Sequence, residues 1–303
     1  MAGGFSFVDL YTSYLSCCFT RAGLTKQSVA VDRETEIHLW VTKPEVRHSR
    51  KRSLLFIHGF GPVSLWQWHR QVKFFAPHFN LFVPDVVFFG ESTTISSERS
   101  EIFQAECLAK LLDKLGVERC SVIGTSYGGF VSYHLAKNHP EKVERVVIAS
   151  SGINLKKNSL NNMGVKKPSD LLLPQTASQL RKLLRHAVSW PFNALPDFIL
   201  NDFISKMYDS NRNCKLELLK SITLGKDDTD EIHPLEQNVL LIWGERDKIF
   251  PLEMAWELEG LLGKKVILKI ISKSSHAPQL QNPSHFNKLL MDFLLVSSHQ
   301  SLL

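Results

Sequence analysis

The 303-residue sequence has no apolar run long enough to cross a membrane, because none approaches 18 residues. Its N-terminal segment, residues 1–24, lacks a basic region and a small-residue cleavage site, and Asp9 interrupts its apolar stretch. We therefore expect no secretory signal. An amphipathic helix fits this segment, either packed on the fold or touching a membrane, where Cys17 and Cys18 would be candidates for acylation.

Cysteine is scarce and irregularly placed. The five cysteines are odd in number, namely Cys17, Cys18, Cys107, Cys120 and Cys214. The sequence has no Cys-x-x-Cys pair and no His/Cys cluster, so we expect neither a disulfide framework nor a metal site. This pattern favours a reducing compartment, and we predict a cytoplasmic protein that is either free or peripheral on a membrane.

Charge of one sign is not concentrated anywhere in the chain. The formal net charge is +6, and the densest basic cluster, Arg47–Arg52, is short and precedes an apolar run. We interpret this cluster as a solvated loop. Zinc-finger spacing and aromatic RNP patterns are also missing, so we predict no nucleic-acid partner.

The chain does contain an alternation of apolar strand-like runs and helical patterns. Runs such as "SLLFI", "CSVIG" and "NVLLIW" are separated by segments with helical spacing, such as residues 98–115. Strands that are apolar throughout are typical of a sheet covered on both faces. The alternation therefore predicts an α/β fold with a mainly parallel central sheet and helices on both faces.

This alternation stops between residues 152 and 234. The interval contains the helix-like pieces "ASQLRKLLRHAV" and "PDFILNDFISKMY" but no convincing strand. We interpret residues 152–234 as a helical lid inserted into a core of residues 1–151 and 235–303. Such a lid would lie over the carboxyl edge of the sheet, where α/β proteins bind ligands.

The stretch "CSVIGTSYGGF" contains a Gly-x-Ser-x-Gly pattern centred on Ser126. The pattern alone is weak, but here it follows an apolar strand and begins a helix, as a nucleophile elbow requires. In that setting a sharp turn exposes the serine, and Gly124 and Gly128 leave room for neighbouring elements. We therefore predict that Ser126 is a catalytic nucleophile.

A serine nucleophile needs a base, and the base needs an orienting carboxylate. Elbow enzymes carry these residues in the order serine, acid, histidine. Asp247 follows the strand-like run "VLLIWG", and His276 follows the next run, "VILKIIS". We predict that Asp247 orients His276 and that His276 takes the proton of Ser126. The competing loop residues are Glu245 for the acid and His233 and His285 for the base.

The glycine loop "FIHGFG" follows an earlier strand-like run and is the predicted oxyanion loop. The backbone N–H groups of Phe60 and Tyr127 are the expected donors, and Gly59 and Gly61 are expected to line the substrate site. The ring of Tyr127 is also expected to face the substrate.

Two nearby polar residues have more ordinary interpretations. We expect His58 to make structural hydrogen bonds beside the glycine loop. We expect Asp85 to hold the turn before "FFGES".

These motifs resemble the α/β-hydrolase superfamily, through "HGFG", "GTSYGG", "GERD" and "SHAPQLQNP". Longer strings, such as "VPDVVFFGES" and "GTSYGGFVSYHLAKNHPEKVERVV", are similar to the plant branch described as epoxide-hydrolase-like or lysophospholipase-like hydrolases. The resemblance implies a Ser–His–Asp hydrolase without a cofactor. Epoxide hydrolases, however, have an aspartate at the elbow, whereas an alkyl ether on Ser126 would be stable to water. We therefore reject epoxide chemistry for this chain.

The lid segment suggests the substrate class. It contains apolar pieces such as "SWPFNALPDFIL", in which Trp190 and Phe192 are candidate substrate contacts. Between residues 152 and 230 it has 12 Lys/Arg against 8 Asp/Glu, so its net charge is positive. We predict a monomeric or homodimeric esterase acting on apolar or lipid-like acyl groups, with peripheral membrane contact as an option. Two alternatives use the same triad: a thioester or C–C bond hydrolase, and a slow or non-enzymatic ligand receptor.

Overall fold

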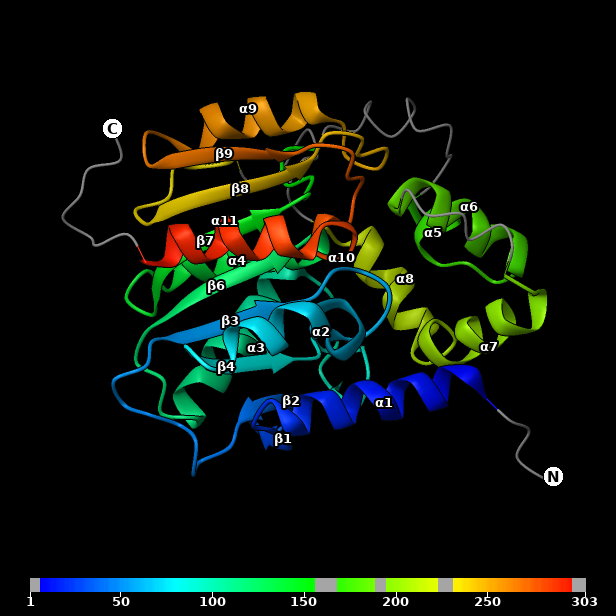
Figure 1. The fold of residues 1–303 in the computed structure, drawn as a ribbon, viewed down its shortest axis with the longest axis horizontal. Coiled ribbons are helices and arrows are strands. Elements are labelled where there is room, and N and C mark those ends of the chain that lie inside the picture. Colours follow the sequence, from blue (N-terminus) through cyan, green and yellow to red (C-terminus); the bar gives the residue numbers. More distant parts are fainter. Residues whose placement is uncertain (1–5, 156–167, 189–194, 223–230, 296–303) are drawn as a thin grey trace.

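The computed structural model describes residues 6–155, 168–188, 195–222 and 231–295. Its centre is a nine-stranded sheet in the order β1-β2-β4-β3-β6-β7-β8-β9, with β5 paired to β2 (Figure 1). Neighbouring strands among β4, β3, β6, β7, β8 and β9 are parallel. The pairs β1–β2, β2–β4 and β2–β5 are antiparallel. The strands are β1 (Leu24–Ala30), β2 (Thr35–Thr42), β3 (Ser53–Ile57), β4 (Asn80–Pro84), β5 (Thr93–Thr94), β6 (Cys120–Thr125), β7 (Val143–Ala149), β8 (Asn238–Gly244) and β9 (Val266–Ile271). The predicted mainly parallel sheet is confirmed.

Helices cover both faces of the sheet, as predicted. The helices α3 (Glu101–Lys114), α4 (Tyr127–Asn138) and α9 (Leu252–Leu262) pack on one face. The helices α1 (Phe7–Arg21), α2 (Ser64–Phe75) and α11 (Pro283–Leu295) pack on the other. Strand β3 shows why two cores form: Leu55 and Ile57 face one layer, and Leu54 and Phe56 face the other, because side chains alternate along a strand.

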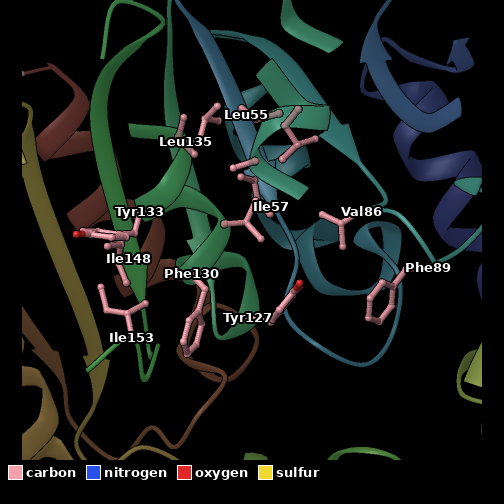
Figure 2. Close-up of a cluster of buried hydrophobic side chains, with 14 of the residues drawn as sticks. Leu55, Ile57, Val86, Phe89, Tyr127, Phe130, Tyr133, Leu135, Ile148 and Ile153 are labelled. Atoms are coloured by element: carbon pink, nitrogen blue, oxygen red, sulfur yellow. The ribbon is translucent and has the colours of Figure 1, made fainter. Parts of the chain in front are cut away.

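One core passes directly beneath the predicted elbow. Figure 2 shows Ile57, Tyr127, Phe130 and Ile148 among the buried side chains that join β3, α4 and β7. Every residue of β6 is buried, so the segment that carries Ser126 is fixed by packing on both sides. A rigid support of this kind suits a residue that must hold one geometry.

The chain between β7 and β8 forms four helices and no strand among its described residues. They are α5 (Pro168–Leu172), α6 (Ala177–Ala187), α7 (Asp197–Met207) and α8 (Arg212–Lys220). The helices predicted from "ASQLRKLLRHAV" and "PDFILNDFISKMY" are confirmed as α6 and α7. These four helices lie together at one end of the sheet, beyond the carboxyl ends of its parallel strands (Figure 1).

The N-terminal segment forms the amphipathic helix expected from the sequence. Val8, Leu15 and Phe19 of α1 are buried, and Phe19 packs on Trp40 of β2 with ring centroids 5.2 Å apart. In the part of the chain that the structure describes, no helix is long and apolar enough to span a bilayer.

Candidate active site

Ser126 occupies a strained turn between β6 and α4. Its φ of 52° and ψ of −120° are unusual for a residue with a side chain. The turn brings α4 close to neighbouring backbone, and glycine makes this approach feasible. A Cβ on Gly124 would lie 2.1 Å from the carbonyl oxygen of Gly128, and one on Gly128 would lie 2.3 Å from that of Ile57. The two glycines therefore have the steric role that the motif predicts.

Backbone hydrogen bonds hold this turn in place. The N–H of Ser126 donates to the carbonyl of Ala149 at 2.9 Å, and the Ser126 carbonyl accepts from the N–H of Gly129 at 2.9 Å. The hydroxyl of Ser151 donates to the same carbonyl at 2.7 Å. These bonds oppose relaxation of the strained conformation and leave the Ser126 hydroxyl free for another partner.

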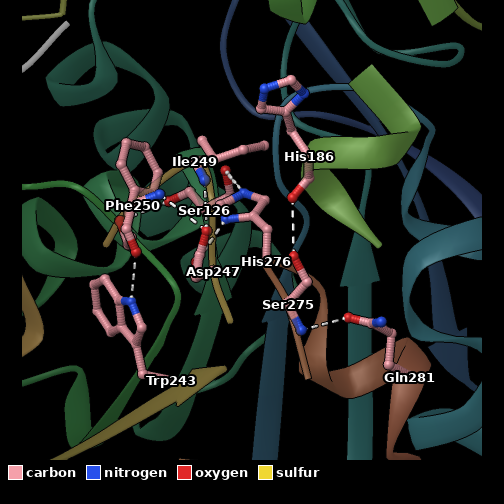
Figure 3. A network of polar contacts seen from close by, with 10 residues as sticks. Ser126, His186, Trp243, Asp247, Ile249, Phe250, Ser275, His276 and Gln281 are labelled. Carbon is pink, nitrogen blue, oxygen red and sulfur yellow. Dashed lines mark hydrogen bonds and ion pairs between the residues drawn. The ribbon is translucent and has the colours of Figure 1, made fainter. Parts of the chain in front are cut away.

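That partner is His276, which the structure places between Ser126 and Asp247 (Figure 3). Its Nε2 lies 3.0 Å from Oγ of Ser126, and its Nδ1 lies 3.0 Å from Oδ2 of Asp247. A carboxylate can only accept, so Nδ1 carries the proton and Nε2 is the acceptor for the serine hydroxyl. The three side chains thus form the hydrogen-bonded chain expected of a Ser–His–Asp triad.

The loop after β8 orients Asp247. Its Oδ1 accepts from the backbone N–H groups of Ile249 at 2.8 Å and Phe250 at 2.9 Å. The indole N–H of Trp243 donates to the carbonyl of Phe250 at 2.8 Å and so supports the same loop. One carboxylate oxygen is fixed by the loop, and the other is directed at the imidazole.

The competing residues lie elsewhere. Glu245 is exposed, and its carboxylate accepts from the N–H of Lys273 at 2.9 Å. The backbone N–H of His233 donates to the hydroxyl of Tyr133, and that of His285 donates to the Asn282 side chain. No hydrogen bond joins these three residues to Ser126 among the described residues.

The candidate oxyanion donors lie beside the elbow. In the described part of the chain, the amide N–H groups of Phe60 and Tyr127 have no protein acceptor. The side chain of Gln67 holds the Phe60 loop, since it accepts from the N–H of Gly59 at 2.9 Å and donates to the Gly59 carbonyl at 3.0 Å. The loop is close to the nucleophile, because a Cβ on Gly59 would lie 2.9 Å from Cβ of Ser126.

The ring of Tyr127 does not face the site, and this expectation was wrong. The side chain is 3% exposed and lies in the core, with Phe130 and Phe60 as aromatic neighbours (Figure 2). Burial raises the pKa of its hydroxyl well above the usual value. The helical position of Tyr127 directs its ring away from the turn while its N–H stays at the turn.

His58 has the structural role predicted for it, whereas the Asp85 side chain holds a different segment from the turn before "FFGES" that was expected. His58 Nε2 accepts from the N–H of Val86 at 3.0 Å, so its Nδ1 carries the proton toward the Gly59 carbonyl, 2.8 Å away. Complete burial lowers the pKa of His58 and favours this neutral form. Asp85 accepts from the N–H of Ser64 at 2.8 Å and thereby anchors the start of α2.

Ser126 and His276 open into a cavity of about 540 Å³, within the usual range for small-molecule sites. Its described wall has no Lys, Arg, Asp or Glu, and its apolar side chains come mainly from α1, α5, α6 and α7. Those side chains include Val8, Leu172, Leu180, Leu183, Leu184, Ile199, Leu200 and Phe203. The arrangement combines an activated hydroxyl with a binding space suited to an uncharged apolar group.

Residues 52–283 match the family described as the alpha/beta hydrolase fold. The chain belongs to this family. The match spans the oxyanion loop, the elbow, the acid loop and the loop carrying His276, and it confirms the fold predicted from the sequence. Ser126, Asp247 and His276 follow β6, β8 and β9 and lie at the carboxyl edge of the parallel strands, where this fold binds ligands.

Several bacterial proteins are similar to this α/β hydrolase. A 2-hydroxy-6-oxononadienedioate/2-hydroxy-6-oxononatrienedioate hydrolase of Paraburkholderia phymatum is 27% identical over 256 residues, covering 80% of this chain and 87% of that protein. A bacterial membrane phospholipase A has a TM-score of 0.77 at 22% identity, covering 95% of this chain and 91% of the other. A putative lipase of Acinetobacter baumannii has a TM-score of 0.78 at 20% identity, covering 97% and 98%. At these identities the two structural similarities show a shared fold only. The resemblance to plant epoxide-hydrolase-like or lysophospholipase-like hydrolases stays a prediction.

The expected substrate contacts are only partly placed. Gly59 lines the cavity, whereas Gly61 is not among its lining residues. Trp190 and Phe192 lie outside the described residues. Among the described residues, no group of three or more His, Cys, Asp or Glu side chains is placed to hold a metal ion.

Sequence reasoning missed Tyr208, which follows α7 and lines the cavity beside the oxyanion loop. A Cβ on Gly61 would lie 3.2 Å from the Tyr208 hydroxyl, and this hydroxyl has no hydrogen-bond partner among the described residues. Burial raises the pKa of Tyr208 above its usual value, so the hydroxyl keeps its proton. No local pattern marks this residue, because its neighbour Gly61 is distant in sequence.

Proposed function

We propose that this α/β hydrolase is a serine esterase that cleaves a carboxylic ester through an acyl-enzyme on Ser126. The proposal depends mainly on one observation, the 3.0 Å contact between Ser126 Oγ and His276 Nε2. His276 is in turn held by Asp247, so the base has both the correct tautomer and a direct path to the hydroxyl proton.

The residues then have defined roles. Oγ of Ser126 attacks the ester carbonyl carbon while His276 Nε2 takes the hydroxyl proton, and the carbonyl oxygen becomes an oxyanion. The N–H groups of Phe60 and Tyr127 stabilise that oxyanion. Collapse breaks the bond to the alcohol oxygen, which receives the proton from His276. Water then attacks the acyl-enzyme by the same route, and the acid and Ser126 are released.

The cavity favours an apolar acyl group. A carboxylate or phosphate buried in the described part of this cavity would meet no cation, and burial of an unpaired charge is costly. An alkyl chain would instead gain about 25 cal/mol for each Å² removed from water. We therefore favour lipid-like esters, lysophospholipids among them, with the charged head outside the cavity and residues 152–234 acting as the lid.

A second candidate is hydrolysis of a carbon–carbon bond. The named substrate of the Paraburkholderia relative is a keto diacid without an ester, so its hydrolysis has to break a carbon–carbon bond. The same triad chemistry can serve this reaction. The absence of Lys and Arg from the described cavity wall argues against a dianionic substrate for this chain.

A substrate series separates the two candidates. Purified protein is assayed against p-nitrophenyl esters from acetate to dodecanoate and, in parallel, against 2-hydroxy-6-oxononadienedioate. The proposal expects kcat/KM to rise with acyl length over the first several carbons and the diacid to be a poor substrate. Efficient turnover of the diacid with slow turnover of every ester would reject ester hydrolysis as the main reaction.

A further inference from the structure

The mouth of the cavity is bordered by α1, the N-terminal helix. Among the described lining residues, the exposed ones are Phe7 and Tyr11, both on α1, while the others are buried or half-buried. Figure 1 shows the N-terminal end of α1 reaching beneath α7. The cavity therefore meets solvent beside these two aromatic residues.

Further exposed apolar side chains extend from this mouth. Leu10 and Tyr14 of α1 are 58% and 60% exposed and share one helix face, being four residues apart. Phe198 of α7 is 60% exposed, and its ring lies 5.9 Å from that of Phe7. We call these residues the rim patch: Phe7, Leu10, Tyr11, Tyr14 and Phe198. Contiguous exposed apolar residues of this kind are characteristic of interaction sites.

The rim patch is held as a unit rather than being loosely attached. Both carboxylate oxygens of Asp202 on α7 accept from the Ser6 hydroxyl, at 2.8 and 3.0 Å, and one also accepts from the N–H of Val8 at 3.1 Å. Lys206 pairs with Asp9 at 2.6 Å. On the other side, the indole N–H of Trp66 donates to Thr12 at 3.0 Å.

Positive charge flanks the rim patch. The adjacent helix α2 exposes Arg70 and Lys73 and has no acidic residue, and neither cation forms an ion pair within the described residues. Arg70 acts electrostatically on the Tyr14 hydroxyl, which places the charge beside the patch. Asp9, the one acidic residue of α1, is already neutralised by Lys206.

We propose that the rim patch docks on an anionic lipid surface, so that the cavity mouth faces the bilayer. Tyrosine and phenylalanine suit the interface between headgroups and acyl chains, and the flanking cations match anionic headgroups. An apolar ester then passes from the bilayer into the cavity without crossing water. This inference rests on the proposed esterase function for its purpose, although the docking itself does not require catalysis.

The test is co-sedimentation with vesicles of neutral phosphatidylcholine and of phosphatidylcholine mixed with phosphatidylserine. Wild-type protein is expected to bind the mixed vesicles more tightly. The double variant Leu10→Ser/Tyr14→Ser should weaken this binding by roughly tenfold or more, because two apolar side chains are lost from the interface. The variant Arg70→Gln/Lys73→Gln should lose the preference for anionic vesicles, since each cation contributes about fivefold.

The matched control is Ile95→Ser/Trp256→Ser, which removes two exposed apolar side chains elsewhere on the fold. It should bind vesicles as the wild type does, and all variants should keep the thermal midpoint of unfolding. Equal weakening by the control and the rim variant would overturn the proposal, as would failure of wild-type protein to bind any vesicle. Self-association of the wild type that is lost in the rim variant would also overturn it and would assign the patch to a dimer.

Two further readouts separate docking from catalysis. The Ser126→Ala variant should bind vesicles like the wild type. The Leu10→Ser/Tyr14→Ser variant should hydrolyse a dissolved short ester normally but lose turnover of a vesicle-borne ester, because neither residue lines the cavity. Vesicle binding without hydrolysis of any ester would reject the proposed function and leave the docking surface standing.

Discussion

The imidazole of His276 lies 3.0 Å from the hydroxyl of Ser126, although 150 positions separate the two residues in the chain. The fold creates this contact by ending β6 and β9 at the same edge of a parallel sheet. A strained turn exposes the serine there, and the loop after β9 returns the histidine to it. The proposed nucleophilic attack requires this contact, because a serine hydroxyl without a neighbouring base is a poor nucleophile.

The orientation of His276 should depend on Asp247. In Asp247→Asn, the side-chain oxygen can still accept from Ile249 and Phe250, so the amide NH₂ faces His276 Nδ1. The imidazole would then carry its proton on Nε2 and could not accept from Ser126. We expect kcat for an ester substrate to fall by roughly 10⁴-fold with the fold intact.

The control for the acid assignment is Glu245→Gln. Its carboxylate contacts Lys273 rather than the imidazole, so turnover should stay within about twofold of wild type. Near-normal activity in Asp247→Asn, together with a large loss in Glu245→Gln, would reverse the assignment. Steady-state kinetics of both variants, with far-ultraviolet circular dichroism as the folding check, would decide whether Asp247 or Glu245 is the acid.

The elbow glycine Gly128 should not tolerate a methyl group. A Cβ there would lie 2.3 Å from the Ile57 carbonyl oxygen and 2.7 Å from that of His58, and backbone atoms have little freedom to move. Gly128→Ala should lower the free energy of unfolding by about 2 kcal/mol or more. Urea denaturation measures this loss.

Gly260 in α9 gives a matched comparison, because a Cβ there would have no neighbour within 4 Å. Gly260→Ala should raise the free energy of unfolding by about 0.5–1 kcal/mol, the usual gain from replacing glycine within a helix. Similar stability changes in the two variants would contradict the close approach assigned to the elbow.

Tyr208 should contribute to substrate binding through its hydroxyl. Tyr208 lines a mainly apolar cavity, and its hydroxyl has no described protein partner. If it donates to a substrate oxygen in both ground and transition states, Tyr208→Phe should raise KM by about fivefold with little change in kcat. An unchanged KM across the ester series would show that the hydroxyl does not contact the substrate.

Lys215 of α8 should make stability depend on alkaline pH. Its side chain is buried, donates to the carbonyl of Met207 at 3.1 Å and lies over the ring of Phe89. Burial lowers its pKa from 10.5 to about 8. Between these values the unfolded chain binds more protons than the folded one, so folded-state stability rises with pH.

The variant Lys215→Met isolates this contribution. The free energy of unfolding of the wild type, minus that of the variant, should increase by up to about 3 kcal/mol between pH 8 and 10.5 and stay constant below pH 8. The buried thiols of Cys107 and Cys120 titrate in both proteins and cancel in the difference. A difference independent of pH would contradict the buried position of the ammonium group.

The sheet and the triad contacts were predictable because they leave local signals. Continuous apolar runs identify strands buried on both faces, and polar residues directly after such runs must meet at one sheet edge. Ser126, Asp247 and His276 each follow a strand in this way. The structure brings these three together by hydrogen bonds that the order of elements already implied.

Features that depend on side-chain direction or distant contacts were not predictable. The motif around Ser126 fixes the backbone of Tyr127 but not its ring, which packs into the core. Tyr208 lies beside the glycine loop and Gln67 binds it, and neither neighbour is indicated by the spacing of apolar residues in the sequence. Short helices such as α10 (Pro278–Gln281) contain too few residues to show a helical period.

Labelling with a fluorophosphonate, followed by intact mass measurement and peptide mapping, is the sharpest test of whether Ser126 is an activated nucleophile. We expect one adduct on wild-type protein, located at Ser126, and no adduct on a folded Ser126→Ala variant. Persistent labelling of Ser126→Ala, or no labelling of correctly folded wild-type protein, would contradict an activated serine at this position. The second result would favour a ligand-binding protein on the hydrolase fold.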